Sequence, residues 1–253
     1  MKAKDFRWGI DKLSDIEPEP SSYYFPEYDP YMQLHGLNQL VEVLLEKSSA
    51  NSTDIQVGKH TGLYSGERGG DAYADDCATS AYFDAFMSSS IAAALAQFLE
   101  SLIKNETLAI KNNEGESAKD SNHVRTLKMT KAKQFWDVGK YWCDQSKKIE
   151  TGIVGGSLQL FEALNLSNKL PINFATHMRV LFGYRNYVMH NGVEWEKTRR
   201  DKFKETIQST GCEGFYWSKS DSEDNVCYLK DAFIKELLTF CNDLYHSFYP
   251  ESA

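Results

Sequence analysis

The sequence predicts an all-α protein, a helical bundle of about six or seven helices with long polar loops and a short C-terminal β-hairpin. Apolar residues recur at helical spacing over several long stretches, whereas strand-like patterns are few and short. The composition is 42% hydrophobic, 25% charged and 13% aromatic over 253 residues. This composition excludes overall disorder and supplies enough apolar side chains for a substantial core.

Residues 1–29 differ from the rest of the chain because they carry three prolines, whose fixed φ angle excludes a long helix. We interpret them as an extended N-terminal arm that packs through Tyr23, Tyr24 and Phe25. Residues 30–253 are then predicted to form a single helical domain.

The first helix is predicted to begin at Pro30, because proline suits the first turn of a helix. Apolar residues follow at helical spacing as far as Leu45. The next stretch, residues 50–74, is polar and contains glycines. We therefore expect a long loop or a short ribbon there.

A second and longer helix is predicted from residue 75 to about residue 103, a stretch without proline or glycine. Asp75 and Asp76 are suited to cap its N-terminus. Residues 87–96 are rich in Ala and Ser, and small side chains let a neighbouring helix approach closely. We place this helix at the centre of the bundle, with its small residues either in the core or in a dimer interface.

The middle of the chain is predicted as a mobile polar excursion over residues 104–129, followed by a helix over residues 130–148. That helix contains an aromatic cluster, which either stacks nucleobases or, as the helical spacing favours, packs in the core. The cluster consists of Phe135, Trp136, Tyr141 and Trp142.

The C-terminal half is predicted to contain three helices, then a β-hairpin and then a final helix. Asn191–Gly192 is a typical helix stop, because glycine readily adopts the left-handed conformation. The predicted elements are a short helix near 157–165, a helix over 172–192, a charged helix over 194–209, a hairpin over 214–229 and an amphipathic helix over 230–249.

Charge and cysteine content restrict the function. The chain carries 28 basic and 36 acidic residues, a net charge of −8, so it can bind a polyanion only through a local basic surface. The five cysteines form no CxxC pair and are interpreted as small core residues in a reducing compartment. No apolar run approaches the roughly 18 residues of a membrane span, and the N-terminus lacks a signal-peptide core. We therefore expect a cytoplasmic protein that does not bind membranes.

Common nucleotide and metal motifs are missing from the sequence. The nearest Gly-Lys pair belongs to VGKHTG, where His60 follows Lys59 in place of the Ser or Thr of a phosphate loop. HExxH, GxSxG and EF-hand patterns are absent, and the six histidines lack metal-ligand spacing. The sequence predicts no metal and no cofactor.

The most informative motif is RNYVMH at positions 185–190. His190 falls in the last turn of the predicted helix, where unpaired carbonyl groups favour the protonated imidazole. Arg185 lies about 140° away around the helix, so it either reaches round or meets a histidine across a symmetric partner. A histidine can transfer protons while a guanidinium holds charge that develops on phosphate oxygens. These residue types therefore suit phosphodiester chemistry.

The motif resembles the signature of HEPN domains, in which an Arg is followed by a polar residue and, after four to six residues, by a His near the end of a long helix. The resemblance implies an all-helical, typically dimeric, metal-independent endoribonuclease that uses the 2′-hydroxyl of RNA as nucleophile. It assigns transition-state stabilisation to Arg185, proton transfer to His190, and orientation of the scissile group or the histidine to Asn186. It also implies a toxin or phage-defence role, with an antitoxin or regulatory protein as a possible partner.

A basic run follows the motif and is a candidate RNA-binding surface. Lys197, Arg199 and Arg200 lie on the predicted charged helix, where they either contact the phosphate backbone or form a solvated face. No tyrosine follows two residues after His190, so the resemblance does not extend to members regulated by tyrosine modification.

Two alternatives remain open for this chain. One is a non-catalytic HEPN-like module that binds RNA or a protein, with Arg185 and His190 serving the helix end and a carboxylate such as Glu194. The other is a helical interaction protein that does not contact nucleic acid.

Overall fold

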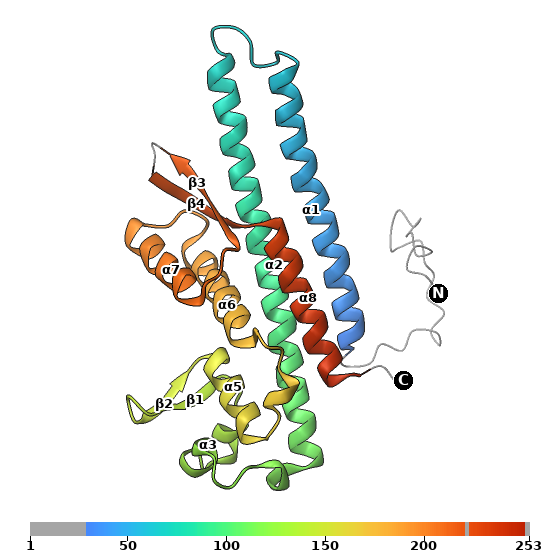
Figure 1. Cartoon of the computed structure of the whole chain (residues 1–253), viewed down its shortest axis with the longest axis vertical. Coiled ribbons are helices and arrows are strands. Elements are labelled where there is room, and N and C mark those ends of the chain that lie inside the picture. Colours follow the sequence, from blue (N-terminus) through green and yellow to red (C-terminus); the bar gives the residue numbers. More distant parts are fainter. Residues whose placement is uncertain (1–28, 221–222, 251–253) are drawn as a thin grey trace, which may run out of the picture.

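The computed structural model describes residues 29–220 and 223–250, and this part of the chain is mainly helical (Figure 1). The fold class predicted from the sequence is confirmed, while the proposed N-terminal arm lies outside the described residues apart from Asp29. The helices are α1 (Pro30–His60), α2 (Gly69–Asn113), α3 (Val124–Lys128), α4 (Ala132–Phe135), α5 (Ile153–Ala163), α6 (Phe174–Asn191), α7 (Lys197–Thr210) and α8 (Asp231–Phe248). Two 3-10 turns, η3 (Gly115–Ala118) and η4 (Ser167–Lys169), and the strands β1 (Lys140–Cys143), β2 (Lys148–Thr151), β3 (Phe215–Ser220) and β4 (Glu223–Leu229) complete it.

Helices α1 and α2 form a long antiparallel hairpin that projects beyond the other elements (Figure 1). The predicted loop over 50–74 is therefore wrong, because both helices continue into it and leave only a short turn. Polar side chains within the hairpin explain why the apolar pattern fades there. Ser48 donates to Asp84 (2.7 Å), and the Asn51 amide donates to Ser80 (2.9 Å).

The predicted start of α2 at Asp75 and Asp76 is also wrong, because the helix begins at Gly69. A Cβ atom at Gly69 would lie 1.8 Å from the carbonyl oxygen of Tyr64, so the turn approaches the helix too closely for any other residue. The sequence prediction treated this glycine as a loop residue, whereas its role is to permit that contact.

Residues 104–129 form ordered structure in place of the predicted excursion. Helix α2 continues to Asn113, and η3 and α3 follow. Arg125 on α3 is fully buried, and its guanidinium donates to five main-chain carbonyl groups at 2.6–3.4 Å. The acceptors are the carbonyls of Gln134, Phe135, Asp137, Lys140 and Gly156.

The predicted helix over 130–148 is replaced by the single turn of α4 and the antiparallel β1–β2 hairpin, in which Trp142 pairs with Ile149. The Arg125 clamp gives the physical reason, since it binds carbonyls that a continuous helix would use internally. Gly156 contributes as well, because a Cβ there would lie 2.1 Å from the Val138 carbonyl oxygen. We call residues 115–169, which include the clamp and this hairpin, the lower module.

The C-terminal predictions are confirmed. Helices α5, α6, α7 and α8 and the β3–β4 hairpin lie within one to four residues of their predicted positions. Helix α6 ends where expected, at Gly192, which has a positive φ of 71°.

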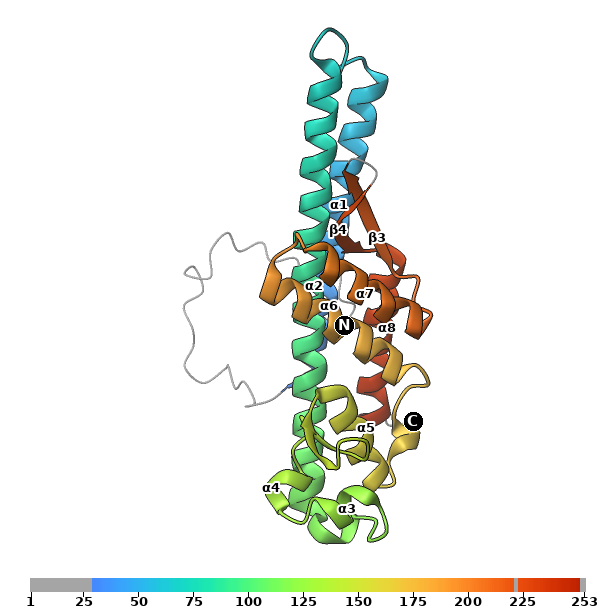
Figure 2. The same ribbon diagram turned by 90° about the vertical axis from the view of Figure 1, so that its left-hand side faces the viewer.

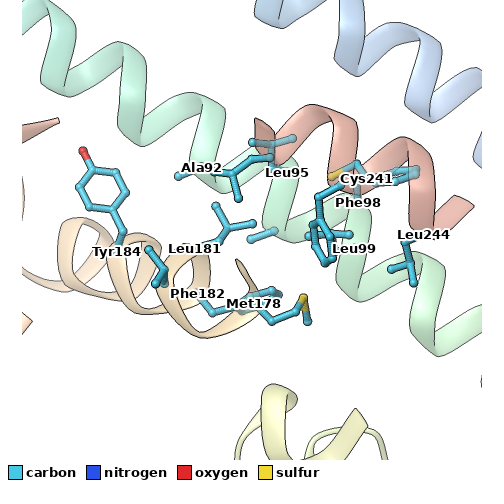
Figure 3. Close-up of a cluster of buried hydrophobic side chains, with 14 of the residues drawn as sticks. Ala92, Leu95, Phe98, Leu99, Met178, Leu181, Phe182, Tyr184, Cys241 and Leu244 are labelled. Atoms are coloured by element: carbon cyan, nitrogen blue, oxygen red, sulfur yellow. The ribbon is translucent and has the colours of Figure 1, made fainter. Parts of the chain in front are cut away.

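The core lies along the middle of α2, where α6 and α8 pack against it (Figures 2 and 3). Figure 3 shows Leu95 and Leu99 of α2 facing Met178 of α6, with Leu244 of α8 beside them. Most residues of the Ala- and Ser-rich stretch 87–96 are buried within one copy of the chain. Its small residues are divided: Ser88, Ala92 and Ala96 are buried in the core, whereas Ser89, Ser90, Ala93 and Ala94 are partly or fully exposed.

One window of α2 is apolar enough, by length and composition, to cross a membrane. However, 56% of that window is buried within the protein. Because α2 is also the helix against which α6 and α8 pack, its apolar composition is explained by the core.

The cysteines differ in their surroundings, which leads to a labelling prediction. Cys227 and Cys241 are buried, and burial raises the pKa of both thiols, whereas Cys77 and Cys143 are partly exposed. Because the thiolate is the reactive form, a thiol reagent should modify Cys77 and Cys143 in native protein long before Cys241. Mass spectrometry of quenched samples measures the order, and equal rates at Cys77 and Cys241 would contradict the packing of α8.

Candidate active site

Helix α6 carries the RNYVMH motif on its last two turns and crosses α2 (Figure 2). Its inner side is fixed by aromatic packing against α7 and the β3–β4 hairpin. Tyr184 and Tyr187 both contact the rings of Trp195 and Phe203, with centroids 5.1–6.1 Å apart. Residues 185, 186 and 190 therefore extend from a rigidly held helix.

Tyr184, directly before Arg185, anchors α6 to β4. Its ring is fully buried, and its hydroxyl donates to the Cys227 carbonyl oxygen at 3.0 Å. Burial raises the pKa of this hydroxyl well above its usual range, so it remains a hydrogen-bond donor at any physiological pH.

Replacing Tyr184 with Phe should destabilise the fold without removing any motif residue. The ring packing survives, but the Cys227 carbonyl loses its buried donor. We expect the free energy of unfolding to fall by about 1–3 kcal/mol. Urea denaturation followed by circular dichroism measures the change, and an unaltered midpoint would show that the hydrogen bond does not anchor the helix.

The end of α6 is closed by local hydrogen bonds. The Gly192 N–H donates to Val188 O (2.9 Å), and the Asn191 side-chain amide donates to Tyr187 O (2.8 Å). The Trp195 indole N–H donates to Gly192 O (2.8 Å). This closure fixes where the helix stops and keeps His190 in its final turn.

The motif side chains lie on the outer side of α6. Arg185 is partly exposed and donates from Nη1 to Asn186 Oδ1 at 2.9 Å, while Asn186 and His190 are exposed. The structure thus brings Arg185 and Asn186 together but does not pair either with His190 in one copy. Because the helix is continuous, Arg185 and His190 diverge by about 140° and are offset by about 7.5 Å along the axis.

Glu194, the carboxylate considered as a structural partner for the motif, is bound elsewhere. The Tyr82 hydroxyl of α2 donates to Glu194 Oε1, and this hydrogen bond raises the pKa of Tyr82. Within residues 29–220 and 223–250, no carboxylate lies within ion-pair distance of Arg185 or His190. In the described part of the chain, neither Arg185 nor His190 therefore forms a salt bridge.

The predicted RNA-binding residues on α7 fall into two groups. Lys197 and Arg199 are exposed. Arg200 is mostly buried, and its guanidinium lies 3.6 Å from a carboxylate oxygen of Glu223 on β4. The β3–β4 hairpin therefore neutralises Arg200. Of the three predicted residues, Lys197 and Arg199 keep exposed charges.

The aromatic cluster of the lower module is also divided. Phe135 and Trp136 are buried, as the core interpretation expects, whereas Tyr141 and Trp142 on β1 are partly exposed. Helical spacing could not separate the two pairs, because the expected helix is a hairpin here.

Two buried polar groups escaped the sequence analysis. Arg125 looks like an ordinary surface residue in the sequence, and no local pattern marks it as buried. His177 is likewise not marked by any local pattern, yet it is buried beside Phe240, and its Nε2 lies 2.8 Å from a carboxylate oxygen of Glu236. Both depend on contacts with distant residues.

His177 and Glu236 line a cavity of about 540 Å³ between α6 and α8, away from the motif at the other end of α6. In the described residues, no group of three or more His, Cys, Asp or Glu side chains is arranged to hold a metal ion.

Comparison with protein-family models, with curated proteins and with solved structures gives no match to this chain.

Proposed function

We propose that the protein is a metal-independent endoribonuclease in which Arg185, Asn186 and His190 form sites shared between two copies of the chain. One observation carries this proposal. An imidazole and a hydrogen-bonded guanidinium–amide pair are presented on the open side of a helix whose other side is deeply buried, and in the described part of the chain no carboxylate engages them.

The residues supply the groups that cleavage by an internal nucleophile requires. An imidazole removes the proton of the 2′-hydroxyl, whose oxygen attacks the adjacent phosphorus, and a protonated imidazole gives a proton to the departing 5′-oxygen. The guanidinium of Arg185 stabilises negative charge on the phosphate oxygens, and Asn186 orients that guanidinium. The products carry a 2′,3′-cyclic phosphate and a 5′-hydroxyl group.

Arg185 and His190 point away from each other within one copy of the chain, but a dimer can bring Arg185 of one copy next to His190 of the other. In a two-fold dimer that packs through the ends of α6, His190 of each copy can face Arg185 of the other. Met189 between them is 63% exposed. Such a residue suits the dry centre of an interface.

The adjacent turn of α2 also carries exposed apolar side chains. Ala85 packs against Val193 just after α6, and Phe86 and Phe83 of the same turn are 60% and 39% exposed. Aromatic residues are enriched at interface cores, where charged residues are depleted. We assign these side chains to the homodimer contact.

Cleavage is tested with pure protein, cellular RNA and excess chelator. The expected result is fragments with 2′,3′-cyclic phosphate ends, produced equally with and without the chelator. Loss of cleavage on chelation would contradict the mechanism. RNA that is bound but never cut would instead support the non-catalytic module.

A cellular consequence follows for a cytoplasmic toxin or defence effector. Expression of the native chain should arrest growth, whereas the His190→Ala variant at the same protein level should not. Immunoblotting controls for the level. Equal toxicity of the two chains would contradict the assigned role of His190.

A further inference from the structure

A basic surface lies on the lower module and is separate from the motif on α6. Residues 125–148 contain seven basic and two acidic side chains, although the whole chain has a net charge of −8. Arg125 is buried in its clamp, and Lys140 pairs with Asp137 at 3.3 Å. The remaining five lysines are exposed. They are Lys128, Lys131, Lys133, Lys147 and Lys148.

These five lysines lack carboxylate partners in the described part of the chain. By contrast, Arg200 and Lys204 of α7 are both paired with acidic residues of β4. Unpaired positive charge gains most from contact with a polyanion, because no internal ion pair has to be broken. The lower module is therefore a stronger electrostatic binding site for a polyanion than α7 is.

Trp142 gives this surface an aromatic platform. It is partly exposed on β1, and Lys128 Nζ lies 5.7 Å from its ring centroid. The indole N–H donates to Asp144 at 2.7 Å, and the Gln159 side chain bonds both the N–H and the C=O of the Trp142 backbone. The ring is thus held in place beside an exposed cation.

The Arg125 clamp makes the platform rigid. It ties α3 to β1 through the Lys140 carbonyl and to α5 through the Gly156 carbonyl. The register of the hairpin places Lys148 opposite Cys143, one residue beyond Trp142. Lys128 and Trp142 are therefore brought together from distant points in the sequence, and Lys148 lies at the same end of the hairpin on its other face, which it shares with Cys143.

We propose that this lower-module surface binds single-stranded RNA, with a base stacked on Trp142, one phosphate held by Lys128, and further phosphates held by Lys147 and Lys148 where the strand passes round the end of the hairpin. Basic grooves with exposed aromatic rings are the usual means of holding single strands without sequence preference. A base on the ring takes the place of the Lys128 ammonium, which then moves to a neighbouring phosphate. The choice of RNA as the polyanion rests on the proposed function.

The position of the surface suggests its use. The lower module joins the N-terminal end of α6, whereas His190 lies at the other end of a helix roughly 27 Å long (Figure 1). RNA held at the module therefore lies well outside the cleavage site. The surface would keep a substrate on the enzyme and would favour RNA with a single-stranded extension.

Binding is tested by fluorescence anisotropy with a labelled 2′-O-methyl oligoribonucleotide of about 12 nucleotides, which has no 2′-hydroxyl to act as nucleophile. The test variant changes Lys128, Lys147 and Lys148 to Ala. A matched control removes three exposed lysines from α1, α2 and α8, namely Lys47, Lys111 and Lys235.

The test variant should bind at least tenfold more weakly than wild type, and the control should change affinity less than about twofold. The slope of log K against log salt should fall by about 2 in the test variant, in line with three lost phosphate contacts on a single strand. Trp142→Leu should weaken binding about tenfold, and Trp142→Phe should recover most of the loss.

Equal binding by the test variant and the control would overturn the proposal. Binding of the wild-type surface to anionic vesicles but not to RNA would overturn it too. The two proposals fail separately. A native chain that binds the oligonucleotide but never cuts RNA contradicts only the ribonuclease assignment, whereas a native chain that cuts RNA while the test variant and the control bind equally contradicts only the lower-module site.

Discussion

The Arg125→Met variant should lose about 3–5 kcal/mol of unfolding free energy, the largest stability effect that we expect in this protein. Methionine matches the length of the buried stem but offers no donors. The five carbonyl groups that now accept from the guanidinium would be left without it in a buried site. A loss of this size is a large fraction of the stability of a typical domain.

The clamp is unusual because it contains no carboxylate acceptor. Burial lowers the pKa of Arg125 to about 10, with a smaller opposing effect from the Asp137 charge. Five carbonyl dipoles, together with the nearby Asp137 charge, therefore compensate the desolvation of this cation. Arg125→Lys should also be destabilising, because an ammonium has three donors and cannot reproduce the planar array of a guanidinium.

Urea unfolding followed by tryptophan fluorescence measures these changes, since Trp136 and Trp142 belong to the lower module. Arg179→Met on the exposed side of α6 is the matched control and should shift stability by less than about 0.5 kcal/mol. If Arg125→Met unfolded at the same urea concentration as this control, the clamp would not hold the module together.

The His190→Ala variant should lose at least about 100-fold in RNA cleavage, the magnitude expected for removal of a positioned acid or base. The side chain is exposed and makes no hydrogen bond to another described side chain, so its removal should leave the fold intact. A discontinuous gel assay with end-labelled RNA measures the rate.

The melting temperature separates a catalytic from a structural role for this residue. A residue kept for chemistry leaves stability unchanged or raises it when removed, whereas a structural residue lowers it. His60→Ala, at an exposed histidine near the end of α1, serves as control and should retain full cleavage. A His190→Ala chain that melts markedly lower and still cuts RNA would reverse the assignment.

The sequence predicted best those elements whose signals are local. Helix α6 has apolar spacing and a glycine stop, and α8 has a clear amphipathic pattern, so both appear close to where they were expected. The β3–β4 hairpin was likewise predicted over residues 214–229, where one arm is aromatic. Each of these signals is complete within about twenty residues.

The errors occurred where tertiary contacts override local preference. The outer half of the α1–α2 hairpin is rich in Ser, Asn and Gly, yet it is helical because the two helices satisfy each other's polar groups. The lower module was misread as a loop and a helix, because Arg125 binds carbonyls up to 31 residues away in sequence. No local pattern encodes such a clamp.

The candidate site was located by sequence, but its surroundings were not. The divergence of Arg185 and His190 follows from helix geometry, and the structure keeps it. The engagement of Glu194 by Tyr82, 112 residues earlier, could not be foreseen. That contact weighs against Glu194 as the structural partner of the motif, because one of its carboxylate oxygens accepts from Tyr82.

A mixing experiment tests the shared site most directly. Inactive Arg185→Ala and His190→Ala chains are combined, allowed to exchange subunits, and assayed for RNA cleavage in chelator. If each site draws Arg185 from one copy and His190 from the other, half of the dimers are mixed and each has one complete site, so activity returns to about a quarter of the native value. If the mixture stays as inactive as its components although mixed dimers form, the two side chains do not act across a two-fold axis.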